Sequence, residues 1–130
     1  MYMDIVVLDR NIGEPENMVD AVELLRAAGH NVDYKGEAGY DPLRDRYDMV
    51  IIHPKGGDPS HLLSNIERYA LENPPKVLCC SNWGATTTND DSVLEPGKLF
   101  GKDNRGIYFA WRSNIDTLPD IVSKIMADNS

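Results

Sequence analysis

The chain has 130 residues, and its 13 Lys and Arg against 21 Asp and Glu give a net charge of −8 at pH 7. This length fits one domain spanning residues 1–130. The acidic balance disfavours partners that are recognised through clustered Lys and Arg, so neither nucleic acid nor an anionic membrane surface is an expected partner.

Strands and helices alternate along the first half of the chain. The β-branched run Asp4–Leu8 predicts a strand that is buried on both faces. A helix is expected next, and it ends near Gly29, a residue that suits a helix C-terminus. The polar, alternating run Asn31–Lys35 predicts an edge strand, and Met49–Ile52 predicts a third, buried strand that ends at His53. In the helix that ends near Gly29, the apolar positions are Met18, Ala21, Val22 and Leu25.

The second half repeats the alternation. Asp58-Pro59 supplies an N-cap and a first-turn proline, and Lys76–Cys80 reads as a fourth strand. The polar segment 81–105 has at most one short helix, at residues 92–100. A fifth strand, Ile107–Trp111, and a last helix, Leu118–Ala127, complete the pattern. The helix that follows Pro59 is expected to face inward with Leu62, Leu63, Ile66, Tyr69 and Ala70. The last helix is expected to do so with Leu118, Ile121, Val122 and Ile125.

This alternation predicts an α/β three-layer sandwich with a five-stranded parallel sheet of the flavodoxin-like order 2-1-3-4-5. Ligands of such sheets bind beyond the carboxyl ends of the strands. The residues expected there are Asp9–Asn11, His53–Asp58, Ser81–Trp83 and Trp111–Asn114.

Several segments resemble the receiver domain of response regulators in two-component signal transduction. They are the opening IVVLDRN with LLRAAGHNV, the stretches YDMVIIHP and KVLCCSN, and the ending IYFAWRSNIDTLPDIVSKI. The resemblance covers nearly the whole chain. It implies a flavodoxin-like, receiver-like fold and a role in signalling through protein partners.

The residues of the family's phosphorylation pocket are matched unevenly. Asp9 falls on the first of two acidic magnesium-binding positions, and Ser81 on the hydroxyl position that binds the phosphoryl group. Arg10 stands at the second acidic position, His53 at the phospho-acceptor aspartate and Trp111 at the lysine. Aspartyl phosphorylation needs a carboxylate nucleophile, several oxygen ligands for magnesium and a nearby cation. The resemblance therefore predicts a receiver-like domain without phosphorylation, catalytic residues, a bound metal or a cofactor.

The expected function is regulation through protein–protein interaction. Trp83, Trp111 and Arg112 are candidate contact residues, because tryptophan at a pocket mouth offers large contact area. The segment 83–105 is longer than its counterpart in the family, in which the fourth helix, fifth strand and fifth helix bind partners. The start of the chain shows no signal peptide, and the adjacent Cys79 and Cys80 cannot link distant segments; both features favour a cytoplasmic protein.

Other interpretations stay open at this point. The domain is alternatively a small-molecule or anion-binding protein, or an enzyme, that uses His53, Ser81 and the threonine-rich loop 85–91. A histidine before a proline, such as His53, is more often a structural histidine than a catalytic base, and Asp9 is alternatively a helix cap or turn former. His53 and His61 flank one loop, but without further ligands they do not make a zinc site. The sequence identifies neither the partner nor the oligomeric state.

Overall fold

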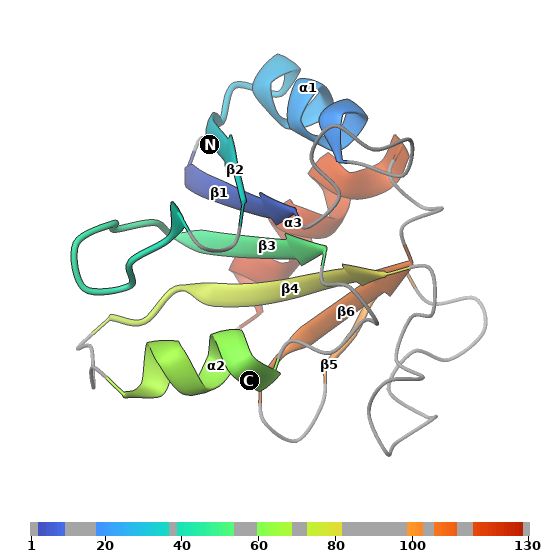
Figure 1. Ribbon diagram of the computed structural model, residues 1–130. Coiled ribbons are helices and arrows are strands. Elements are labelled where there is room, and N and C mark those ends of the chain that lie inside the picture. The colour runs from blue at the N-terminus through green and yellow to red at the C-terminus, as the bar shows by residue number, and fades with distance from the viewer. Residues whose placement is uncertain are drawn as a thin grey trace.

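The computed structural model describes residues 3–9, 18–36, 39–53, 60–68, 73–81, 99–102, 106–111 and 116–128, apart from the side chains of residues 60, 61, 81 and 111. Within these ranges, none of the helices has the length and apolar character needed to cross a membrane. The elements (Figure 1) are β1 (Asp4–Asp9), α1 (Val19–Ala27), β2 (Asn31–Lys35), β3 (Met49–His53), α2 (Ser60–Glu67), β4 (Lys76–Ser81), β5 (Gly101–Lys102), β6 (Tyr108–Trp111) and α3 (Leu118–Ala127).

The strands form one mostly parallel sheet with the order β2-β1-β3-β4-β6-β5. The five parallel strands follow the order predicted from the sequence, with β2 at one edge. The prediction of five strands is wrong in one respect, because Gly101–Lys102 adds β5, a sixth strand antiparallel to β6. Two residues are too few to show the alternation that marks a strand in sequence. The half-buried side chains of Leu99 and Phe100, which pack against the core, precede β5.

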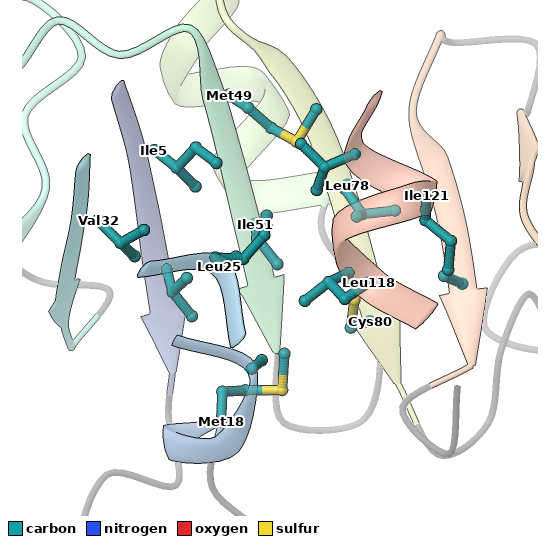
Figure 2. Packing of buried hydrophobic residues seen from close by; sticks show 14 of the residues in the cluster. Ile5, Met18, Leu25, Val32, Met49, Ile51, Leu78, Cys80, Leu118 and Ile121 are labelled. Carbon is teal, nitrogen blue, oxygen red and sulfur yellow. The ribbon is translucent and has the colours of Figure 1, made fainter. Parts of the chain in front are cut away.

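The sheet separates two apolar layers, because successive residues of a strand point to opposite faces. Helices α1 and α3 cover one face and α2 covers the other (Figure 1). Figure 2 shows the first face, where side chains from neighbouring strands meet those of the two helices. We call it the α1/α3 layer; it includes Ile5, Val7, Met18, Leu25, Met49, Ile51, Leu78, Cys80, Leu118 and Ile121. The opposite α2 layer includes Val6, Leu8, Val50, Ile52, Leu62, Ile66, Cys79 and Phe109.

The helices α1 and α3 bury the apolar positions that the sequence predicts, and α3 has the predicted bounds. Gly29 follows α1 with a φ of +98°, a conformation that side chains other than glycine's rarely adopt, which explains why the helix stops there. In α2, Leu62 and Ile66 are buried as expected. Tyr69 and Ala70, expected on the same helix face, lie outside the described residues.

The C-terminal end of α3 is held by side chains of the sheet. The ammonium group of Lys76 donates hydrogen bonds to the carbonyl oxygens of Ile125 (2.9 Å) and Asp128 (2.6 Å). The hydroxyl of Tyr108 donates to Asp128 Oδ2 (2.6 Å), and Lys102 Nζ lies 3.8 Å from the same oxygen. Because the last carbonyls of a helix lack partners within the helix, these contacts fix α3 against β4, β5 and β6.

Candidate functional site

Asp9 and His53 lie side by side at the carboxyl ends of two neighbouring strands. They are register partners at the ends of β1 and β3. Asp9 Oδ1 is 3.1 Å from His53 Nδ1, and the two side chains are only 0% and 5% exposed, respectively. In the order β2-β1-β3, the strand that follows β1 in sequence lies on one side of it and the next strand on the other. The pair therefore lies at the point where the strand order reverses, which is where ligands of doubly wound sheets bind. The predicted convergence of Asp9 and His53 is confirmed.

Within the described part of the chain, Met18 and Tyr34 donate hydrogen bonds to the other oxygen of the Asp9 carboxylate. The backbone N–H of Met18 donates to Oδ2 over 2.8 Å, and the hydroxyl of Tyr34 donates to it over 2.5 Å. Met18 is the N-cap residue of α1, so the carboxylate also lies at the positive end of that helix. The interpretation of Asp9 as a helix cap is therefore correct in a long-range form: the residue caps α1 from the end of β1.

The contact with Asp9 limits the tautomers of His53. If the Asp9 carboxylate is ionised, it has no hydrogen to donate, and the hydrogen of the bond is then carried by His53 Nδ1. In the neutral ring, Nε2 then holds a lone pair and is an acceptor only. No residue in the described part of the chain forms a hydrogen bond with Nε2.

The Asp9 carboxylate is enclosed by groups of the protein itself. Protein donors approach both of its oxygens, and the side chain is fully buried. Magnesium needs several oxygen ligands in an octahedral arrangement. Within the described ranges, no three His, Cys, Asp or Glu side chains come together as a potential metal site. In this structure Asp9 organises β1, β2, β3 and α1.

The remaining predicted site residues are only partly visible. Ser81 and Trp111 are register partners at the ends of β4 and β6, so their backbones lie at the same sheet edge as Asp9 and His53. Their side chains are not described, and neither is that of His61. Outside the described residues lie Arg10, Trp83, Arg112 and the loop 85–91.

Tyr34 is a site residue that sequence reasoning missed. It pairs in register with Val7, and its hydroxyl reaches the carboxylate of Asp9 two residues further along β1. The signal is an aromatic residue with a hydroxyl group in an otherwise polar edge strand. This signal identifies Tyr34 as a partner of Asp9 only when the β1–β2 register is known, because a shift of one residue turns the side chain to the other face of the sheet.

Comparison of the chain with protein-family models, with curated proteins and with solved structures finds no match. The function is therefore inferred from the residues at the carboxyl ends of β1 and β3.

Proposed function

We propose that the protein is a receiver-like regulatory domain that works without aspartyl phosphorylation and acts by binding another protein. One observation carries this proposal: the Asp9 carboxylate, at the family's magnesium position, is buried and accepts hydrogen bonds from Met18, Tyr34 and His53. A carboxylate bound in this way is a structural group. It is poorly placed to become part of a magnesium shell.

The acceptor position supports the same proposal. In a receiver, an aspartate there attacks the phosphorus atom. Here His53 takes that place, and its Nδ1 is hydrogen-bonded to Asp9 Oδ1 over 3.1 Å. A second carboxylate in place of the imidazole would put two negative charges together in a buried site, which needs a metal ion or another cation for balance. The Asp9–His53 pair avoids this requirement.

The hydrogen bonds also connect the elements on which a phosphorylation switch would act. They join the ends of β1 and β3, the edge strand β2 through Tyr34, and the start of α1 through Met18. A ligand shifts a conformational equilibrium only through its different affinity for the two states. We expect a single state at this edge, whose surface is recognised constitutively.

The partner is expected to bind at the sheet edge formed by β6 and β5 together with α3. This edge corresponds to part of the partner-binding face that the receiver resemblance implies. The observed edge has the strand β5, which the predicted five-stranded sheet lacks. The contact between Lys102 and Asp128 connects β5 to the end of α3. The outer side of an edge strand offers backbone groups to a partner. Trp83, Trp111 and Arg112 stay predicted contact residues.

Two measurements test the loss of phosphorylation. Incubation with magnesium and acetyl phosphate should leave the intact mass unchanged, and magnesium with beryllofluoride should leave the amide spectrum unchanged. The variant Arg10→Asp, His53→Asp, Trp111→Lys restores the family's charged groups and should respond near Ser81. A phosphoryl adduct or a clear beryllofluoride response in the wild-type protein would contradict the proposal.

A pull-down tests the binding face. Wild-type protein and a Lys102→Glu variant are used to capture partners from the native cell extract, with Arg44→Glu as the control. Lys102 is on β5, whereas Arg44 is exposed in the turn that precedes β3. The partner should be lost with Lys102→Glu and kept with Arg44→Glu. A partner retained equally by both variants would place the interface elsewhere.

A further inference from the structure

The edge strand β2 is contacted by a side chain of the helix that precedes it. The guanidinium group of Arg26, in the last turn of α1, donates two hydrogen bonds to the carbonyl oxygen of Val32. Nη2 donates over 2.7 Å and Nε over 3.3 Å. In the described part of the chain, β2 is the last strand on its side of the sheet and pairs with β1. A charged donor therefore lies against an edge strand.

The carbonyl of Val32 points away from the sheet. Along a strand, the backbone N–H and C=O groups of alternate residues face the same neighbour. The N–H of Asn31 donates to the carbonyl of Met3, just before β1, so residues 31, 33 and 35 face β1. The backbone groups of Val32 and Tyr34 therefore lie on the outer side of β2. Arg26 occupies an acceptor that a further strand would use.

The outer side of an edge strand is a template for pairing with another chain, and proteins limit such pairing by short edge strands and by charged side chains placed on the edge. β2 combines both features, because it has only five residues and the Arg26 guanidinium is bound to its outer side. We infer that Arg26 closes the β2 edge to strand pairing, and that without the guanidinium group β2 pairs with the β2 strand of a second copy of this chain.

The charges of β2 favour a second copy as the partner. When two β2 strands run antiparallel about a two-fold axis at Tyr34, Asp33 of each copy lies opposite Lys35 of the other. The two side chains share one face of the sheet: the Tyr47 hydroxyl donates to Asp33, and Lys35 Nζ lies 5.8 Å from the centre of the Tyr47 ring. Opposite charges at facing positions stabilise antiparallel pairs, and the two-fold axis repeats each contact.

The same register shows how Arg26 interferes. With Tyr34 opposite Tyr34, Val32 faces Gly36 of the second copy, and the carbonyl of Val32 is the acceptor for the Gly36 N–H. In the folded chain, Arg26 already donates to this oxygen. Hydrogen bonds from a charged donor are stronger than those between neutral backbone groups. The second copy must therefore displace the guanidinium group before its strand can pair.

The test compares variants of the full chain by sedimentation velocity over a range of protein concentrations. Arg26→Met keeps the apolar part of the side chain and removes both donors. Its average mass should rise with concentration toward about twofold that of the wild-type protein, as expected for a two-fold dimer. Arg44→Met removes the same charge from an exposed side chain and should behave like the wild-type protein. Arg26→Lys keeps a charged donor and should associate less than Arg26→Met.

A second substitution tests the register. Lys35→Asp, added to Arg26→Met, places like charges opposite each other at Asp33 and should weaken the association. In the associated Arg26→Met protein, amide exchange of Val32 and Tyr34 should become slower as the concentration rises. If Arg26→Met does not give the amide spectrum of a folded chain, Arg26→Gln takes its place, since glutamine is an uncharged residue of similar helix propensity.

Two outcomes would overturn the inference. Folded Arg26 variants that keep the mass of the wild-type protein at all concentrations would show that the contact only joins α1 to β2, even if they unfold at lower urea. Association that Lys35→Asp leaves unchanged, without slower exchange in β2, would place the contact between copies on another surface. Protein capture through the β5 edge involves the opposite end of the sheet, so this inference and the proposed function fail separately.

Discussion

The carboxylate of Asp9 and the imidazole of His53 are register partners whose nearest atoms, Oδ1 and Nδ1, are 3.1 Å apart. The two residues are 44 positions apart in the chain, and the β1–β3 pairing places them side by side. Both are buried, so their contact is little screened by water. The stability of this edge of the sheet should therefore depend strongly on each partner.

Asp9→Asn should destabilise the protein by roughly 3 kcal/mol. An asparagine keeps the shape of the side chain but has one acceptor oxygen, and its NH₂ group would face the hydrogens now donated by Met18, Tyr34 or His53. Urea unfolding of the two proteins measures the difference.

The matched control for this substitution is Asp120→Asn. Asp120 forms an exposed pair with Lys124 at 3.1 Å, and such pairs contribute less than about 0.5 kcal/mol. A loss below about 1 kcal/mol for Asp9→Asn would show that the three donors find other acceptors in the folded protein.

Tyr34→Phe should cost about 1 kcal/mol, the usual net contribution of one hydrogen bond, because it removes the donor to Asp9 Oδ2. Tyr47→Phe is the comparison, since the Tyr47 hydroxyl donates to the exposed carboxylate of Asp33 over the same distance, 2.5 Å. The cost should be smaller there, because water replaces the lost partner. Equal midpoints for the two variants in chemical unfolding would argue against a special role for Tyr34.

His30 should make the protein less stable in mild acid. Burial lowers the pKa of His30 below its usual 6.5, and its Nδ1 accepts a hydrogen bond from the N–H of Met3 (3.1 Å). As the pH falls through 6.5 the unfolded chain gains the proton first, so stability decreases toward the lower folded pKa.

The His30→Asn variant isolates this effect, because its side-chain oxygen accepts from Met3 without titrating. Free energies of unfolding at about pH 7.5 and about pH 5.5 give the comparison. The wild-type protein should lose more stability between the two conditions than the variant. An equal loss would mean that carboxylates alone set the acid sensitivity.

Lys76→Met should loosen the end of α3 and cost about 1–2 kcal/mol, since two carbonyl oxygens lose a charged donor. Lys124→Met is the control, because it removes an exposed ammonium group from the same helix. Amide hydrogen exchange near Ile125 should become faster in the first variant only. Unchanged protection would show that packing of the α3 face is sufficient.

Much of the fold could be predicted because buried apolar residues recur in the sequence at the spacing of a helix or as continuous strand-length runs. In α3, Leu118, Ile121, Val122 and Ile125 recur at helical spacing, and all four are buried. The first, third and fourth strands read as continuous apolar runs because helices cover both faces of the sheet. Local patterns of this kind are sufficient to order the elements and to bring Asp9 and His53 to one edge.

What could not be predicted depends on contacts between distant segments. The pairing of Gly101–Lys102 with β6 has no periodic signal in two residues. The hydrogen bond from Tyr34 to Asp9 requires the register of β1 on β2, and the choice of Met18 as the capped residue requires the position of α1. The residue types at the site were thus foreseen better than their bonds to one another.

The adjacent cysteines of β4 lie on opposite sides of the sheet, Cys80 in the α1/α3 layer and Cys79 in the α2 layer. Both are fully or almost fully buried, and neither forms a disulfide. A thiol reagent can therefore reach each sulfur only when the helices on that side detach. In the variant Cys79→Ala, the rate of thiol labelling would measure how often the α1/α3 layer opens around Cys80. In the variant Cys80→Ala, it would measure the opening of the α2 layer around Cys79.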